Sequence, residues 1–184
     1  MAVLVEAISV VARRDSIDRS YRGGWQAFLR AIPNSTLCFD EELARVGFMT
    51  PQDVEHFVEV LVAQGLTFLK DGKSEDIAVV DQQRGPTTPC EWLEFAQLPF
   101  DTGRVSACWL FEGPRVAAGI HLRGTRMQLA TPPGWSYEGS LSQRFTFLPA
   151  EEQADRLRFV RTEGNVDVYL DLITGREVFI GQTT

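Results

Sequence analysis

The chain has few residues of the types that commonly build metal and redox sites. Its 184 residues include only 3 cysteines and 2 histidines, and neither type forms a close pair along the sequence. Structural zinc sites and redox motifs need cysteine or histidine ligands at short, fixed spacing. We therefore expect no metal and no cofactor. The odd number of cysteines indicates free thiols in a reducing compartment.

Long apolar runs are missing too. No stretch approaches the ~18 uninterrupted apolar residues of a membrane-spanning helix. The apolar N-terminal run contains Glu6 and is followed by Arg13 and Arg14, whereas a secretory signal carries its positive charge first. These features predict a cytoplasmic protein with no membrane partner.

Positive charge is scarce, with 18 Lys and Arg against 25 Asp and Glu and a net charge of -7. Nucleic-acid binding needs a concentrated positive field, so we expect no nucleic-acid partner. Residues 34–81 hold 10 acidic and 3 basic side chains. This acidic third has two interpretations: a face that steers a basic partner protein, or a surface that only keeps the protein soluble.

What the sequence does contain is the composition of a folded protein. The hydrophobic content of 44% and the charged content of 23% are ordinary for a globular domain. A chain of this length buries roughly 70% of its unfolded surface. No Gly-, Ser- or Pro-rich linker divides it, so two parts, residues 1–70 and 71–184, and one continuous domain are both open.

The first half alternates strand and helix patterns. Residues 3–12 are almost continuously apolar and predict one buried strand. Residues 16–32 predict a helix that Gly23 and Gly24 interrupt and Pro33 ends.

A hairpin over residues 36–40 and 43–49 should follow, although residues 40–46 could instead form a helical turn. Thr50 and Pro51 then begin a clear amphipathic helix, 51–64. Residues 66–70 return as a strand. This β-α-β-β-α-β order predicts a ferredoxin-like α+β unit, with two helices on one face of an antiparallel sheet.

The second half, 71–184, has strand patterns and predicts an antiparallel β-rich region. The expected strands are residues 77–81, 91–97, 105–111, 116–122, 127–131 and 144–148. Residues 157–161, 166–172 and 177–180 are separated by glycine-containing turns and predict a three-stranded meander. In its middle strand, Val168 and Leu170 should be buried, and Asp167 and Asp171 should face solvent or turn amides.

Cys90, which follows Pro89 and precedes Glu91 and Trp92, is a candidate nucleophile. A nucleophilic cysteine needs a base nearby or a positive environment. Neither His56 nor His121 lies in a catalytic pattern, and Glu91 and Glu94 oppose any positive field. We therefore expect a partly buried thiol without a histidine partner.

Two polar-aromatic stretches are better candidates for binding. Both combine turn residues with tryptophan or tyrosine and with hydrogen-bonding side chains, a composition that suits recognition. Their candidate binding residues are Asp81, Gln83, Arg84, Cys90, Glu91 and Trp92 in the first, and Trp135, Tyr137 and Glu138 in the second. Alternatively, both tryptophans only cover the edges of the core.

The sequence thus favours a non-catalytic binding or regulatory protein that recognises a partner protein or a small ligand. An inhibitor or immunity-type protein that masks a basic partner would fit the acidic third. The alternative is a small hydrolase or transferase that uses Cys90 or the nearby carboxylates. An antiparallel sheet should bring the two stretches together beside Arg84.

Overall fold

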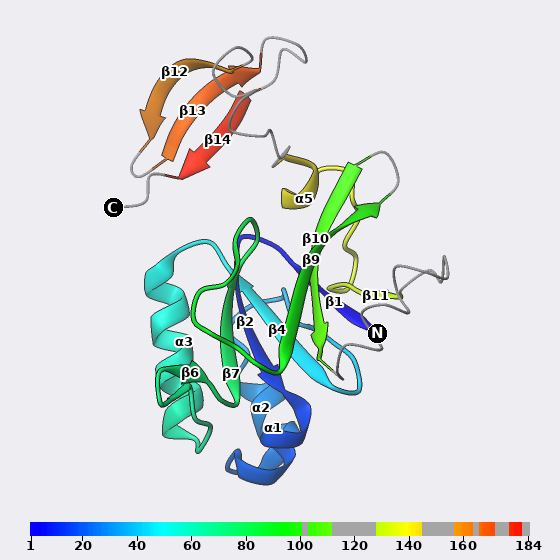
Figure 1. The fold of residues 1–184 in the computed structure, drawn as a ribbon, viewed down its shortest axis with the longest axis vertical. Helices are drawn as coiled ribbons and strands as arrows, with labels where there is room; N and C mark the ends of the chain where they lie inside the picture. Colours follow the sequence, from blue (N-terminus) through cyan, green and yellow to red (C-terminus); the bar gives the residue numbers. More distant parts are fainter. Residues whose placement is uncertain (101–102, 112–127, 145–156, 164–165, 172–176, 182–184) are drawn as a thin grey trace. The chain divides into compact units, whose positions relative to one another are not determined.

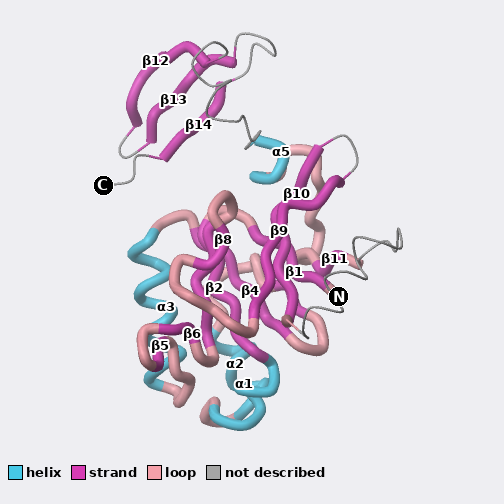
Figure 2. Tube along the Cα trace, in the orientation of Figure 1, coloured by secondary structure: helices cyan, strands magenta, loops and turns pink. Residues whose placement is uncertain are grey.

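The computed structural model describes residues 1–100, 103–111, 128–144, 157–163, 166–171 and 177–181 (Figure 1). The chain divides into two compact units, Met1–Trp135 and Ser136–Thr184. The described residues are mixed α+β, with few helices and several sheets in which antiparallel pairing dominates. Figure 2 shows how strand outweighs helix.

The apolar N-terminal run forms two strands, and the prediction of one strand over residues 3–12 is wrong. Strand β1 (Ala2–Val5) and strand β2 (Ile8–Arg13) belong to different sheets. Between them Ala7 adopts a left-handed φ of 49°, unusual for a residue with a side chain. The continuous apolar pattern arises because both strands are buried, and it hides the break.

The larger sheet, which we call the central sheet, has five strands in the order β3-β4-β2-β7-β8, all antiparallel. Its other strands are β3 (Cys38–Phe39), β4 (Leu43–Phe48), β7 (Ile77–Asp81) and β8 (Gly85–Pro86). The predicted hairpin over residues 36–49 is therefore confirmed. Asp40 closes its turn, accepting hydrogen bonds at Oδ1 from the backbone N–H groups of Glu42 and Leu43.

The interrupted helix predicted over residues 16–32 is present as two pieces. Helix α1 (Arg14–Ser20) and helix α2 (Gly24–Ala31) are separated by a turn. Gly23 and Gly24 have φ of 85° and 60°, which glycine adopts without strain. The glycine pair thus sets the break that the sequence predicted.

Helix α3 (Pro51–Ala63) matches its prediction most closely. The Thr50 side chain accepts a hydrogen bond from the Asp53 backbone N–H at 3.3 Å, and Pro51 occupies the first turn. All three helices pack on the same face of the central sheet, in one apolar cluster that includes Phe28, Phe57 and Leu61.

The fourth long strand of the central sheet was expected at residues 66–70, and this prediction is wrong. Strand β7 takes that place, paired with β2. Only β5 (Leu69–Lys70) is a strand in the expected stretch, and it forms a small hairpin with β6 (Lys73–Ser74). Residues on both sides of position 70 therefore contribute to one fold. A division at residue 70 stays a prediction.

A second sheet has the order β11-β1-β10-β9. It contains β9 (Leu93–Phe100), β10 (Gly103–Leu110) and the short β11 (Leu129–Ala130). Three predicted strands are thereby found with shifted limits, and the strand predicted at 116–122 lies outside the described residues. Strand β1 runs close to β3 and β4, on the side of the central sheet opposite the helices.

In the second unit, the predicted meander is confirmed as β12 (Leu157–Glu163), β13 (Val166–Asp171) and β14 (Glu177–Gly181). Val168 is buried as expected, whereas Leu170 is only half-buried. The side chains of Asp167 and Asp171 lie outside the described set. The strand predicted at 144–148 is contradicted at its first residue, which ends helix α5 (Leu141–Arg144); its other residues are not described.

Among the described residues, no helix combines the length and the apolar character needed to cross a bilayer.

Candidate ligand-binding pocket

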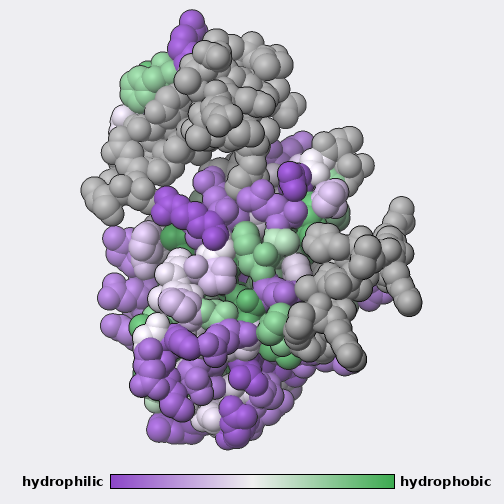
Figure 3. Space-filling model, in the orientation of Figure 1, coloured by the Kyte–Doolittle hydropathy of each residue, from purple (hydrophilic) through white to green (hydrophobic). Residues whose placement is uncertain are grey.

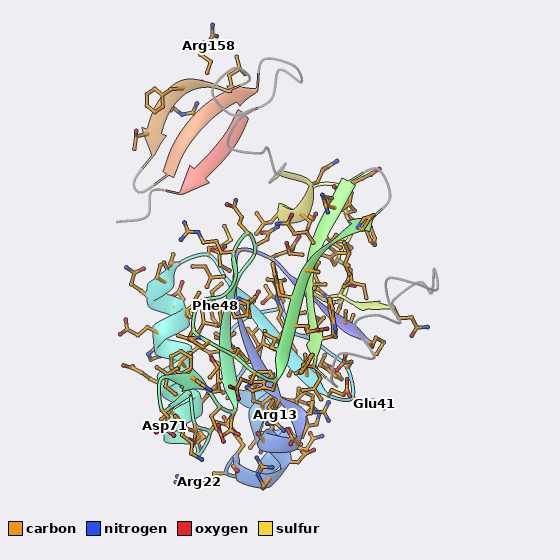
Figure 4. All side chains as sticks on the ribbon, viewed as in Figure 1. Arg13, Arg22, Glu41, Phe48, Asp71 and Arg158 are labelled. Carbon is orange, nitrogen blue, oxygen red and sulfur yellow. The ribbon has the colours of Figure 1, made fainter. Side chains whose placement is uncertain are left out.

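A pocket of about 520 Å³ opens at the end of strand β2, between the β5–β6 hairpin and the start of β9. This end of the first unit is largely hydrophilic on the face shown in Figure 3. Figure 4 labels two lining residues, Arg13 and Asp71, which come from different elements. The full lining is Arg13, Lys70, Asp71, Lys73, Ser74, Glu75, Glu91, Trp92 and Phe111. Two predicted site residues, Glu91 and Trp92, are among them.

The β5–β6 hairpin forms one wall because its tip is an Asp-Gly turn. Asp71 and Gly72 both have positive φ, 51° and 77°, as a tight two-residue hairpin turn requires. The turn pairs Lys70 with Lys73 across the hairpin. Two like charges therefore face each other across the hairpin, and acidic side chains nearby are needed to offset their repulsion.

Acidic side chains supply that compensation. Lys70 lies 3.9 Å from Glu75, and Lys73 forms a close ion pair with Glu91. All four side chains are largely exposed, so each pair stabilises the fold by no more than about 1 kcal/mol. These ion pairs can exchange partners at low cost.

Arg13 has a different counter-ion arrangement. Its Nε donates to Oδ1 of Asp15 at 3.0 Å, and its Nη2 donates to Oδ2 at 2.7 Å. Asp15 is not a lining residue. The Arg13 backbone N–H also donates to the Asp76 carbonyl at 3.1 Å, which ties the end of β2 to the hairpin region. A fixed guanidinium therefore forms one side of the pocket.

Trp92 is held rigidly next to Arg13. Its indole Nε1 donates to the Ser74 carbonyl at 3.1 Å, and its carbonyl accepts from the Phe111 N–H at 2.8 Å. The Arg13 guanidinium carbon lies 5.9 Å from the centre of the Trp92 ring, within cation–π range. The Ser74 N–H in turn donates to the Pro89 carbonyl at 2.9 Å. The Pro-rich stretch therefore positions a preformed aromatic wall.

Cys90 is half-buried close to this wall, but it is not activated. Burial raises the pKa of its thiol above the ordinary value, and hydrogen bonds from the backbone of Trp92 and Leu93 and the charge of Arg13 oppose this only in part. A nucleophilic cysteine needs the opposite shift. His56 is exposed on α3, and His121 lies outside the described residues. That Cys90 has no histidine partner stays a prediction.

No group of three or more His, Cys, Asp or Glu side chains in the described part of the chain is placed to hold a metal ion. The expectation of no metal site remains a prediction for the whole chain.

The first polar-aromatic stretch is not one loop. At its start, Oδ1 of Asp81 accepts from the backbone N–H groups of Gln83 and Arg84, forming a tight turn at the last residue of β7. At its end, Trp92 contacts Ser74, which precedes the first residue of β7. Asp81, Gln83 and Arg84 therefore lie at the opposite end of β7 from the pocket.

Gln82, in the turn that follows Asp81, forms hydrogen bonds to the break between β1 and β2, which the sequence did not reveal. The buried Gln82 accepts at Oε1 from the Ala7 N–H at 2.8 Å, and its backbone N–H donates to the Ala7 carbonyl at 2.9 Å. Ser106 on β10 donates through Oγ to the Gln82 carbonyl at 2.5 Å. Gln82 thus holds the unusual break between β1 and β2.

The second polar-aromatic stretch is also divided. Trp135 packs edge-on against Phe100, with ring centres 5.7 Å apart, at the far end of β9 from Trp92. Its indole nitrogen is buried without an acceptor among the described residues. Tyr137 and Glu138 belong to the second unit, where the carbonyl of each accepts from a serine hydroxyl. The predicted meeting of this stretch with Arg84 stays a prediction.

Seven pocket residues were not identified as site residues from the sequence: Arg13, Lys70, Asp71, Lys73, Ser74, Glu75 and Phe111. They come from segments that are far apart along the chain. One signal was available, because Lys-Asp-Gly-Lys at residues 70–73 has the composition of a tight hairpin. Nothing in the sequence places that hairpin beside Trp92.

Comparison of the chain with protein-family models, with curated proteins and with solved structures gives no match.

Proposed function

We propose that this is a non-catalytic binding protein that recognises a small ligand or a partner protein, with the pocket at Trp92 as its principal site. The observation that carries the proposal is that Glu91 and Trp92 line a cavity of about 520 Å³ together with Arg13 and the β5–β6 hairpin. Small-molecule sites are typically concave, of this size, and combine aromatic surface with a few fixed polar groups.

The rigidity of the site supports binding. The Trp92 ring is fixed by its hydrogen bond to the Ser74 carbonyl, so a ligand that stacks on it does not have to order it. The raised pKa of Cys90 disfavours the alternative, a hydrolase or transferase that uses this thiol.

A regulatory role of the inhibitor or immunity type is the form of this proposal that includes a partner protein. The acidic residues 34–81 would face a basic partner, and Trp135, Tyr137 and Glu138 are further candidate contact residues. Asp81, Gln83 and Arg84 would contact such a partner and not the ligand of the pocket. No nucleic-acid partner is part of the proposal.

Two finer assignments accompany it. We infer that the central sheet and helices α1–α3 form a ferredoxin-like unit whose fourth strand is β7; the antiparallel order β3-β4-β2-β7 and the shared helix face support this. We also infer a cytoplasmic location, because Cys38, Cys90 and Cys108 are all free thiols.

The proposal is tested by screening a library of small aromatic and polar fragments with ligand-observed NMR. We expect fragments whose binding is lost in Trp92→Leu and retained in Arg30→Gln, which changes an exposed side chain on α2. Affinity should fall at least about tenfold in Trp92→Leu, as for an aromatic hot-spot residue.

Folding of Trp92→Leu is checked by its unfolding transition. If no fragment depends on Trp92, and a pull-down from cell extract captures no partner that Trp92→Leu or Trp135→Leu releases, the binding proposal is wrong. Turnover that is abolished by Cys90→Ala would instead establish the enzyme alternative.

A further inference from the structure

The pocket has a ligand preference that can be derived from its walls. We propose that it binds a small aromatic acid, that is, a planar ring carrying one carboxylate. This inference rests on the proposed function and specifies the ligand of that same site.

The ring would lie against Trp92 and Phe111. Phe111 leaves 41% of its surface exposed. Trp92 immediately precedes β9 and Phe111 immediately follows β10, and the hydrogen bond between the Phe111 N–H and the Trp92 carbonyl joins them. A flat ring buries the most apolar area against two such faces and gains stacking geometry in addition. An aliphatic ligand would gain only the area.

The carboxylate would be bound by Arg13. Asp15 occupies the Nε and Nη2 edge of its guanidinium from outside the pocket. A guanidinium carries five N–H donors. The remaining donors of Arg13 have no acceptor among the described residues. Only 29% of the Arg13 side chain is exposed, so a charge-assisted hydrogen bond there is less weakened by water than one to a lysine at the rim.

The ion pairs of the lining indicate which ligand charge the pocket prefers. The acids that face them, Glu75 and Glu91, are paired with Lys70 and Lys73, whereas the counter-ion of Arg13 is outside the lining. Asp71, the third acid of the lining, forms no ion pair with Arg13, so none of the described lining acids is paired with that guanidinium. A ligand ammonium group would have to displace a lysine or pair with Asp71 at the exposed tip of the hairpin. A carboxylate on a ring stacked on Trp92 would instead meet Arg13, whose guanidinium carbon lies 5.9 Å from the centre of the Trp92 ring.

The acids also limit how much negative charge the ligand carries. Asp71, Glu75 and Glu91 line the same pocket and would repel a polyanion such as a nucleoside triphosphate. One carboxylate matches the single guanidinium.

The test uses isothermal titration calorimetry with three ligands that share one ring: phenylacetate, phenethylamine and phenylethanol. We expect phenylacetate to bind at least about tenfold more tightly than phenethylamine, with phenylethanol between them. Arg13→Gln should weaken phenylacetate at least about tenfold and leave phenylethanol nearly unchanged. Arg30→Gln is the matched control and should change neither.

Two substitutions at exposed side chains, which should not disturb folding, are expected to change the affinity in opposite directions. Because Glu91 holds Lys73, Glu91→Gln should tighten phenylacetate about threefold and Lys73→Gln should weaken it about threefold. A cationic ligand would show both signs reversed. The peptide Gly-Gly-Phe, which carries the same ring and carboxylate at a chain end, should bind more weakly than phenylacetate.

Tighter binding of phenethylamine, equal binding of all three ligands, or reversed signs in the two variants would overturn the aromatic-acid assignment while leaving the binding proposal intact. Tighter binding of Gly-Gly-Phe would assign the site to protein C-termini and also overturn it. If all three ligands fail but the fragment screen finds other compounds that need Trp92, only the ligand class is wrong. If the screen is also empty, the binding proposal fails with it.

Discussion

Both faces of the central sheet bury apolar side chains, but they differ in one buried charge. The face under the helices is apolar, and Val10, Val46 and Val79 pack there against Phe57 and Leu61. The opposite face, which looks toward β1, carries the charged side chain of Arg45 with only 1% exposed. Strands β2, β4 and β7 therefore pack against the helices on one face, whereas the other face holds a buried guanidinium.

Arg45 is buried, and its guanidinium donates hydrogen bonds to one hydroxyl and two backbone carbonyls. Its Nε donates to Ser9 Oγ at 2.8 Å, Nη1 to the Thr36 carbonyl at 3.2 Å, and Nη2 to the Glu6 carbonyl at 3.0 Å. Burial lowers the pKa of the guanidinium from its ordinary value. A Cβ on Gly47 would lie 2.8 Å from Nη2, so only glycine leaves room for the group.

The face under the helices is specified by volume, whereas the opposite face, which also buries Val11, Leu43 and Val80, is specified by hydrogen bonding where it surrounds Arg45. An apolar face tolerates side chains of similar size, because dispersion and burial are not directional. A buried guanidinium fixes each acceptor around it, because an unpaired acceptor there is costly. Arg45 thereby connects β4 to β2 and to the carbonyl of Glu6, where the chain leaves β1.

The largest effect is expected for Arg45→Met. This change removes the donor of two carbonyls and one hydroxyl, and we expect the free energy of unfolding to fall by about 4 kcal/mol. Urea denaturation measures it. Arg30→Met on the exposed surface of α2 is the control and should have almost no effect. A stable Arg45→Met variant would show that the surroundings of Arg45, too, are specified only by volume.

Leu61→Ala tests the apolar face. Leu61 is fully buried on α3, and its truncation should lower the free energy of unfolding by about 3 kcal/mol through lost burial and a residual cavity. Its neighbour Val62 is exposed on the same helix, so Val62→Ala should change stability by less than about 0.5 kcal/mol. Equal effects of the two substitutions would contradict the burial argument.

Alkaline pH should lower the free energy of unfolding through the buried thiols. Burial raises the pKa of the Cys38 and Cys108 thiols. The folded state therefore retains protons that the unfolded state loses above about pH 8.5, and stability must fall as pH rises from there. The expected slope is about 1.4 kcal/mol per pH unit for each thiol.

Urea denaturation between about pH 7 and 10 checks this slope. Because burial raises the pKa of Cys90 as well, Cys108→Ala removes one of three contributing thiols and should reduce the slope by about a third. An unchanged slope in that variant would mean that other groups cause the alkaline loss.

The smallest effect concerns the break between β1 and β2. Ala7 has a φ of 49°, so Ala7→Gly should relieve left-handed strain and stabilise the fold by about 0.5 kcal/mol. The same change at the helical Ala63 should destabilise it by up to about 1 kcal/mol. Thermal unfolding of both variants gives the comparison, and equal signs would argue against strain at Ala7.

Local patterns were sufficient where neighbours in sequence decide the structure. Thr50, Pro51 and Gly65 delimit α3, and the glycine pair at 23–24 divides α1 from α2, because capping and φ preferences act within a few residues. The meander of the second unit followed from its alternation and its turns in the same way.

The candidate site was only partly predictable for the same reason. Glu91 and Trp92 stood out by composition, but the grouping of residues 81–92 into one loop assumed that neighbours in sequence share one site. After the turn at Asp81 the chain reverses, and β8 pairs antiparallel with the end of β7. The two ends of the stretch 81–92 therefore lie at opposite ends of β7. Arg13, the last residue of β2, and Phe111, which follows β10, complete the pocket.

By itself the sequence determined that this is an α+β protein, where helix α3 and the strands of the meander lie to within a few residues, and that Glu91 and Trp92 were candidates for binding. Only the tertiary structure decided that the first apolar run splits between two sheets, that Arg45 is the buried cation, and that Arg13 meets Trp92. The physical reason is range. Propensity, capping and alternation act over a few residues, whereas pairing partners and buried polar contacts join segments that only folding brings together.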